Sequence, residues 1–239
     1  MHEKGNFYSG ISAKHQPRGV TILYEDYDII VIDKMAGLLT MGTDREKERT
    51  AYFMLNEYVK KGNSRSRNRI FIVHRLDRDT SGLLIFAKTE QAKHFLQDKW
   101  EGFDKKYFAV VHGILQEKEG TITSYLAENN SYRVYSANPE KGKFSSTGYQ
   151  VIKESEKYSL LEIKLFTGRK NQIRVHLSEK GHPVVGDKIY GGKDTSAKRL
   201  ALHSASLKIL HPYTTKEMVF TSEIPAYFNT LVKKKENRK

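Results

Sequence analysis

The stretch that decides the fold is residues 73–88, Val-His-Arg-Leu-Asp-Arg-Asp-Thr-Ser-Gly-Leu-Leu-Ile-Phe-Ala-Lys. An apolar run, 70–73, leads into its polar middle, and a second apolar run, 83–86, follows it. Short apolar runs rich in Ile, Val and Phe indicate buried strands. A polar segment that joins such strands is where a scaffold holds reactive side chains, because the sheet fixes the loop. Asp77 is therefore a candidate carboxylate at a strand end, with Arg75 nearby; an ordinary turn with solvated arginines is the alternative.

The composition points to a folded protein with a polyanionic partner. The 239 residues suffice for one large domain or two small ones, and a hydrophobic content of 38% allows a sizeable core. The formal net charge of +13 favours nucleic acid as the partner, although a protein that is basic only for solubility is the alternative. The absence of cysteine excludes disulfides, thiolate catalysis and cysteine zinc sites.

The two ends of the chain read as polar segments outside the core. Residues 1–19 lack periodicity and are expected to form a flexible arm, and residues 233–239 form a basic tail. The arm has no apolar signal core, and no run approaches the roughly 20 apolar residues that a membrane helix needs. We expect a cytoplasmic protein with no membrane partner.

Alternating and apolar runs predict an α+β fold with a mixed, largely antiparallel sheet flanked by helices and loops, because strands follow one another without intervening helices. Thr50 and Thr89 are expected to cap helices over 50–61 and 89–103. A further helix is expected to open within 167–177 and to end at Gly181. The expected strands are 20–24, 29–33, 70–73, 83–86, 105–113, 120–127, 147–154, 158–166, 200–207 and 218–221, with a last helix over 225–232. Residues 128–146, rich in Asn, Ser and Lys, are expected to form a long connection.

One basic segment lies between the first helix and the strand before Asp77. Residues 60–69 read Lys-Lys-Gly-Asn-Ser-Arg-Ser-Arg-Asn-Arg. Such a run before a strand indicates a loop, and its charges make it either a phosphate clamp or a solvated charge run.

The string His-Arg-Leu-Asp-x-x-Thr-Ser-Gly at 74–82 resembles the signature of the RluA-type RNA pseudouridine synthases, in which the aspartate is catalytic. Residues 33–39 are similar to the first motif of that family, with Met35 where proline is usual, which is expected to loosen the turn. Residues 105–113 are similar to the second motif, whose tyrosine, here Tyr107, packs against the target base.

The third motif of the family, Thr-Gly-Arg-x-His-Gln-Ile-Arg-x-His, is matched by residues 167–176 with Asn171 in place of the first histidine. We expect this departure to alter a supporting contact and to leave the activity in place. The Gly-His-Pro segment at 181–191, the strand at 200–207 and the pair at 211–212 continue the resemblance in the same order.

The resemblance implies an isomerase that converts uridine in structured ribosomal or transfer RNA to pseudouridine, using a flipped base and a catalytic aspartate. It implies that Asp77 is catalytic and that substrate is bound by Tyr107, Arg174, His74, Arg75, Arg169 and Gln172. It also implies that Arg174 pairs with Asp77, whereas His74 and Arg75 are expected to shape the loop and contact RNA. No cofactor and no metal are expected. We expect a monomer with one catalytic domain over 20–232 and no preceding RNA-binding module.

Other classes of function compete with this interpretation. A non-catalytic RNA-binding or ribosome-assembly protein with the same fold is the main alternative, and a hydrolase that releases free uracil is another. The pair Asp77 and Asp79 suggests two-carboxylate chemistry. In a strand-like segment, however, these residues point to opposite faces, so we expect Asp77 to act alone.

Overall fold

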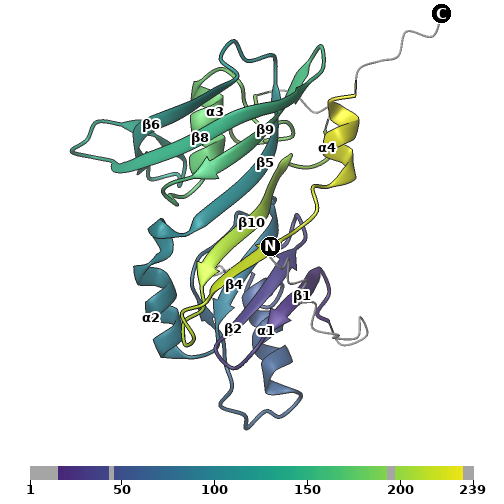
Figure 1. Cartoon of the computed structure of the whole chain (residues 1–239), viewed down its shortest axis with the longest axis vertical. Helices are drawn as coiled ribbons and strands as arrows, with labels where there is room; N and C mark the ends of the chain where they lie inside the picture. Colours follow the sequence, from purple (N-terminus) through teal and green to yellow (C-terminus); the bar gives the residue numbers. More distant parts are fainter. Residues whose placement is uncertain (1–15, 43–45, 193–196, 234–239) are drawn as a thin grey trace, which may run out of the picture. The chain divides into compact units, whose positions relative to one another are not determined.

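The computed structural model describes residues 16–42, 46–192 and 197–233 (Figure 1). Most of the predicted N-terminal arm and all but Lys233 of the basic tail therefore lie outside the described residues. The chain divides into two compact units. The first comprises Met1–Trp100 with Ile209–Phe220, and the second comprises Glu101–Lys208 with Thr221–Lys239. No helix among the described residues is long and apolar enough to cross a membrane.

In the first unit, three antiparallel strands form the centre: β1 (Val20–Glu25), β2 (Ile29–Lys34) and β4 (Ser81–Ala87). The short strand β3 (Phe71–Ile72) pairs with β4. All seven residues of β4 are buried, as expected for an apolar strand that is covered on both faces of its sheet. This buried strand begins four residues after Asp77 and fixes one end of its loop.

Two helices pack in this unit, and both begin where the sequence predicts. Helix α1 (Ala51–Lys60) is capped by Thr50, whose side chain accepts from the Phe53 amide, and buries Ala51, Leu55 and Val59 at a spacing of four. Helix α2 (Glu90–Asp98) is capped by Thr89 in the same way. It ends earlier than predicted, and a short 3₁₀ turn, η2 (Trp100–Gly102), follows it.

The second unit is a larger antiparallel sheet. Its strands are ordered β10-β5-β9-β8-β6-β7, and every pair in the order is antiparallel. Their bounds are β5 (Asp104–His112), β6 (Glu119–Glu128), β7 (Val134–Ala137), β8 (Lys143–Glu154), β9 (Tyr158–Leu165) and β10 (Leu202–Leu210). Strand β11 (Glu217–Thr221) lies mostly in the first unit. Helix α3 (Gln172–Glu179) contacts β6, β7 and β8, and α4 (Ala226–Leu231) contacts β5 and β9 (Figure 1).

The expected fold class is confirmed, but one predicted element is wrong. The segment 128–146 is not one long connection, since it contains β7 and the start of β8. The Asn129 side chain explains this, because its oxygen accepts from the Ser131 and Arg133 amides and so folds a tight turn in a polar sequence. The third helix begins at Gln172, inside the range predicted for its start, and the preceding Asn171 adopts a left-handed conformation with φ of 53°.

Candidate active site

The main chain of the Asp77 loop is held by hydrogen bonds on both sides of Asp77. On the N-terminal side, Thr40 Oγ1 donates to the Leu76 carbonyl at 2.8 Å and accepts from the Leu76 amide at 3.1 Å. The Thr80 amide donates to the Asp77 carbonyl at 3.2 Å and closes a turn. Leu76 and Thr80 are buried, whereas Asp77 between them is half-buried. The carboxylate is thus placed by a backbone that has little freedom to move.

On the C-terminal side, the fully buried Lys34 ties the loop to the first motif. Its ammonium donates to the carbonyls of Leu38 at 2.7 Å, Met35 at 3.1 Å and Arg78 at 3.1 Å. The Gly37 amide also donates to the Arg78 carbonyl, at 2.9 Å. A buried ammonium is stable only when its protons are satisfied, and these three carbonyls provide acceptors. Lys34 is therefore a positioning residue for the Asp77 loop.

Replacing Lys34 by Met should leave these carbonyls without their buried donor. We expect Lys34→Met to lower the free energy of unfolding by about 2–4 kcal/mol, because each buried unsatisfied carbonyl costs about 1–3 kcal/mol and the new side chain recovers only part of this. Urea denaturation measures the change, and Lys141→Met, at an exposed position, is the control that should alter stability by about 0.5 kcal/mol or less. Equal stability of the two variants would contradict the role given to Lys34.

The other predicted residues of this loop have distinct surroundings. His74 Nε2 accepts from the Ile85 amide at 3.2 Å, so that nitrogen carries no proton, and its ring stacks on Trp100 with centroids 4.1 Å apart. Arg75 and Asp79 are exposed. Residues 73–80 form an irregular turn and not a strand, so the argument from alternating faces does not apply to Asp77 and Asp79.

In the second unit, Arg174 on α3 forms a bidentate ion pair with Asp187. Nε lies 2.7 Å from one carboxylate oxygen and Nη2 lies 2.8 Å from the other. The same carboxylate accepts from the Ile189 and Tyr190 amides. Burial disfavours the charged form, but the Arg174 guanidinium and these amides outweigh it and hold the pKa of Asp187 below its usual value. Asp187 thereby fixes the rotamer of Arg174.

Asn171, which stands where the family usually has histidine, supports Arg174. Its amide oxygen accepts from Arg174 Nη1 at 3.2 Å, and its amide nitrogen donates to the Tyr190 hydroxyl at 3.1 Å. The left-handed backbone of Asn171 suits asparagine better than most residues. The departure from the family therefore falls on a supporting contact, as expected; its effect on activity stays a prediction.

Gln172 holds the turn that precedes α3. Its oxygen accepts from Thr167 Oγ1 at 2.8 Å and from the Arg169 amide at 3.0 Å, and its nitrogen donates to the Ser146 carbonyl and to Thr147 Oγ1. These bonds use both oxygen lone pairs and both N–H groups of a side chain that is 2% exposed. Arg169 is more accessible: its Nε donates to the Phe144 carbonyl and its guanidinium meets Glu101 at 3.2 Å.

Tyr107 lies on β5, where it is paired with Ser204 of β10 and Ile163 of β9. It is among the buried residues of the core. Its expected packing against the target base stays a prediction.

His176, the last residue of the third motif, is 1% exposed and lies in a cluster of hydroxyl groups. Its Nδ1 is 2.9 Å from Thr147 Oγ1, and its Nε2 is 3.0 Å from Ser124 Oγ and 3.1 Å from Ser145 Oγ. Burial lowers the pKa of His176 to about 4. The ring is therefore neutral near pH 7 and joins α3 to β6 and β8 through hydrogen bonds.

The depressed pKa of His176 predicts a pH dependence of stability. Between about 4 and the ordinary value of 6.5, only the unfolded chain binds the proton, so acidification through this window destabilises the fold. We expect the free energy of unfolding to fall by about 3 kcal/mol across this window from this group. In His176→Gln, the dependence over pH 4–6.5 should flatten in urea titrations, whereas the control His94→Gln, at an exposed position, should keep it. An unchanged profile in His176→Gln would contradict this assignment.

One group of side chains in the first unit has the composition of a metal site, but hydrogen bonds within the protein explain why these side chains lie together. Asp26, Asp28 and His211 place ligand atoms within 4.8 Å of one another. Asp26 Oδ1 accepts from the Asp28 and Ile29 amides, and its Oδ2 accepts from the Tyr24 hydroxyl and lies 2.7 Å from His211 Nε2. These bonds account for the cluster as a clamp between the β1–β2 turn and the segment that begins at His211.

The structure also bears on the expectation for Met35. Its amide donates to the Gly19 carbonyl at 3.0 Å, a bond that proline, the usual residue of the family, cannot make. Met35 therefore adds a connection to this turn, and the expected loosening stays a prediction.

The seven predicted site residues belong to different units: His74, Arg75 and Asp77 to the first, and Tyr107, Arg169, Gln172 and Arg174 to the second.

Sequence reasoning missed the roles of Lys34, Thr40, Asp187 and His176. Lys34, Asp187 and His176 lie inside the motifs, but the motifs do not show which groups these side chains contact in the folded protein. Thr40 lies just beyond the first motif and carried no separate signal.

Comparisons with known proteins agree with these motifs. Residues 28–179 match the family model for RNA pseudouridylate synthase. An uncharacterized RNA pseudouridine synthase of Bacillus subtilis, YhcT, is 34% identical over 215 residues, covering 88% of this chain and 70% of the relative. The ribosomal large subunit pseudouridine synthase D of Nitrosomonas europaea is 36% identical over 225 residues, covering 88% and 64%.

Solved structures show the same fold. Human RNA pseudouridylate synthase domain containing 4 aligns with a TM-score of 0.72 at 22% identity, covering 87% of this chain and 90% of that one. Human RNA pseudouridylate synthase domain containing 1 aligns with a TM-score of 0.67 at 25% identity, covering 85% and 83%. The family match spans more than half of the chain and includes the Asp77 loop and α3, so this chain belongs to the RNA pseudouridine synthases, isomerases that convert uridine in RNA to pseudouridine.

Proposed function

We propose that this protein isomerises selected uridines in structured ribosomal or transfer RNA, with Asp77 as its single catalytic carboxylate. The observation that carries the proposal is the anchoring of the Asp77 loop, with Thr40 bound to Leu76 before it and Lys34 bound to Arg78 after it. A half-buried carboxylate on a main chain held at both ends is suited to act on one defined atom.

The reaction breaks the N1–C1′ bond of uridine, rotates the uracil and forms a C5–C1′ bond, with no net gain or loss of electrons. A base inside a stack cannot reach a side chain, so the uridine must first be flipped out at a cost of a few kcal/mol. Asp77 must be ionised, either to attack the sugar or base or to remove a sugar proton. Phosphate contacts by the basic surface offset the cost of flipping.

The residues of the second unit have supporting roles in this proposal. Tyr107 stacks on the target uracil, an interaction worth about 1–3 kcal/mol. Arg174 contributes a guanidinium whose orientation is set by Asp187. Arg169 contacts RNA. Gln172, whose hydrogen-bonding groups are all used within the protein, shapes the turn before α3 and does not contact RNA directly.

In the first unit, Arg75 contacts RNA from its exposed position, and His74 supports the loop through Trp100 and the Ile85 amide. We further propose that the enzyme works in the cytoplasm as a monomer. The proposed chemistry requires neither a cofactor nor a metal.

The experiment that tests the proposal compares RNA from a strain that lacks the gene with RNA from its parent by carbodiimide-based pseudouridine mapping. We expect one or a few sites to be lost and to return with the intact gene but not with Asp77→Ala. If no site is lost while the purified protein still binds RNA, a role in ribosome assembly would replace catalysis as the explanation.

A further inference from the structure

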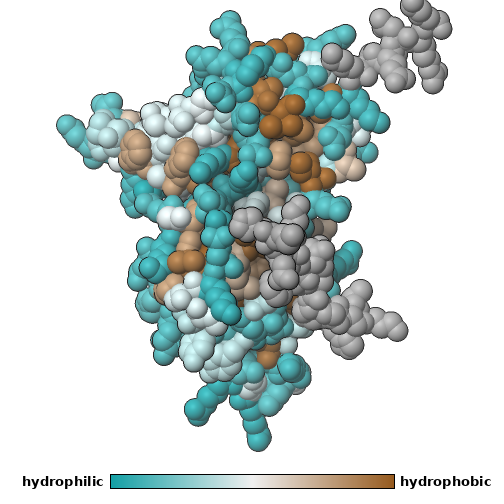
Figure 2. Space-filling model, in the orientation of Figure 1, coloured by the Kyte–Doolittle hydropathy of each residue, from teal (hydrophilic) through white to brown (hydrophobic). Residues whose placement is uncertain are grey.

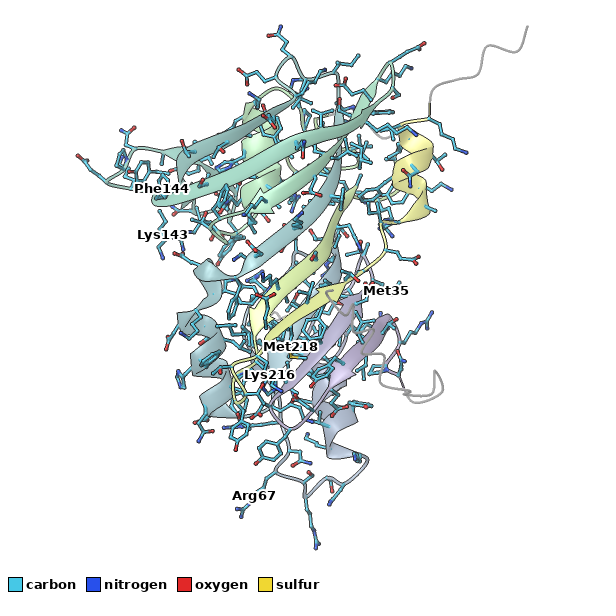
Figure 3. All side chains as sticks on the ribbon, viewed as in Figure 1. Met35, Arg67, Lys143, Phe144, Lys216 and Met218 are labelled. Atoms are coloured by element: carbon cyan, nitrogen blue, oxygen red, sulfur yellow. The ribbon has the colours of Figure 1, made fainter. Side chains whose placement is uncertain are left out.

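The loop between α1 and β3, residues 61–70 (the α1–β3 loop), concentrates positive charge. Lys61, Arg65, Arg67 and Arg69 lie in it, and the sequence contains no Asp or Glu from 58 to 76. All residues from 61 to 69 are exposed except the half-buried Ser66. This end of the first unit is hydrophilic in Figure 2, and Figure 3 shows Arg67 at the tip of the loop.

The α1–β3 loop has a defined shape despite its polarity. Asn63 Oδ1 accepts from the Arg65 amide at 3.0 Å, and Ser66 Oγ accepts from the Asn68 amide at 3.2 Å. The loop returns to α1 through Asn68 Nδ2, which donates to the Val59 carbonyl, and through the Ile70 amide, which donates to Asn56. Arg65 and Arg67 thus extend from two consecutive turns, and less conformational entropy is lost when such a loop binds a partner.

The cations of this loop differ from many others on the surface. Elsewhere, lysines pair with carboxylates, as Lys106 does with Glu162 and Lys180 with Glu117. Within the loop, Arg69 is also paired, with Glu90 at 2.8 Å, and its guanidinium lies over the Phe71 ring. In the part of the chain that the structure describes, no carboxylate forms a salt bridge with Lys61, Arg65 or Arg67.

We propose that the α1–β3 loop is a docking element for the phosphate backbone of the RNA substrate, with Arg65 and Arg67 as its main contacts. This inference rests on the proposed function, since it assumes an RNA substrate. The choice of phosphate follows from the chemistry of the loop: guanidinium groups bind phosphate oxygens in a bidentate manner, and residues 61–69 include no aromatic side chain on which a base could stack. The contact is therefore independent of base sequence and sensitive to salt.

The test measures the affinity of Arg65→Gln/Arg67→Gln for a fluorescently labelled RNA stem-loop by anisotropy at several salt concentrations. Loss of two phosphate contacts should weaken binding on the order of tenfold at about 100 mM salt and reduce the slope of log affinity against log salt by about 1.4–1.8. The conservative variant Arg65→Lys/Arg67→Lys keeps the charges and should retain the slope, with a weaker affinity because the bidentate geometry is lost.

The matched control removes two positive charges from another part of the surface. Lys153 and Lys157 are exposed in the β8–β9 region, where Glu154 and Glu156 are neighbours in sequence, and Lys153→Gln/Lys157→Gln should bind RNA like the unmodified protein. Unchanged affinity and slope in the arginine variant, or an equal loss in the control, would overturn the proposal. The assay measures binding without turnover. The docking proposal is therefore tested separately from the proposal that Asp77 is the catalytic residue. Equal melting temperatures of the variants confirm that the fold is retained.

Discussion

Asp77→Asn should abolish pseudouridine formation, with a loss of at least about a thousandfold in turnover, while the protein still folds and binds RNA. The amide has nearly the shape of the carboxylate but neither its charge nor its basicity, so it can neither attack nor remove a proton. The hydrogen bonds that hold the loop involve Leu76, Arg78 and the Asp77 main chain, and the substitution leaves these in place. Single-turnover assays with saturating enzyme separate this loss of chemistry from a loss of affinity.

Asp79→Asn is the matched control for this prediction. Asp79 is two residues away on the same turn and is exposed, so its amide variant should convert uridine at the normal rate. Two results would refute the assignment of Asp77: normal turnover in Asp77→Asn, or equal losses in both variants, which would indicate a general effect of charge on the loop.

Arg174→Met should be the most destabilising of the single substitutions considered. The Asp187 side chain is fully buried, and without Arg174 its carboxylate keeps two amide donors but loses its cation. Breaking a buried pair in this way costs about 3–5 kcal/mol. Urea denaturation of Arg174→Met, Asp187→Asn and the double variant provides the test, and the double variant should be less destabilised than the sum of the two single variants.

An exposed pair supplies the comparison for Arg174. Lys106 and Glu162 lie 2.9 Å apart on neighbouring strands with the lysine side chain about half exposed, and Lys106→Met should cost no more than about 1 kcal/mol. If Arg174→Met is as stable as Lys106→Met, then the buried Arg174–Asp187 pair does not contribute to stability as predicted.

Much of the fold could be predicted because local patterns coincide with tertiary structure. The apolar run before Ala87 is a buried strand, and Thr50 and Thr89 cap helices as their positions suggest. Ile173 and Leu177, four residues apart on α3, are both buried, as apolar residues at a helical spacing should be. The main error concerns residues 128–146, where the Asn129 side chain folds a tight turn before β7.

The candidate site was only partly predictable for a different reason. A motif shows which residue types recur, but the partner of a buried charge lies elsewhere in the chain. Lys34 contacts the Arg78 carbonyl 44 residues away, and His176 contacts Ser124 52 residues away. Thr40 supports Leu76 across 36 residues, and nothing in its own sequence neighbourhood marks it for that role. Such contacts depend on register between strands, which periodicity alone does not specify.

The measurement that tests the central claim most directly analyses the products of the purified enzyme. RNA from a strain that lacks the gene, labelled in its uracil, is incubated with the unmodified protein or with Asp77→Asn, and nucleosides and free bases are then separated. We predict that the unmodified protein forms pseudouridine without releasing free uracil and that Asp77→Asn forms none. Release of free uracil, or equal pseudouridine formation by Asp77→Asn, would contradict isomerisation by a single catalytic aspartate.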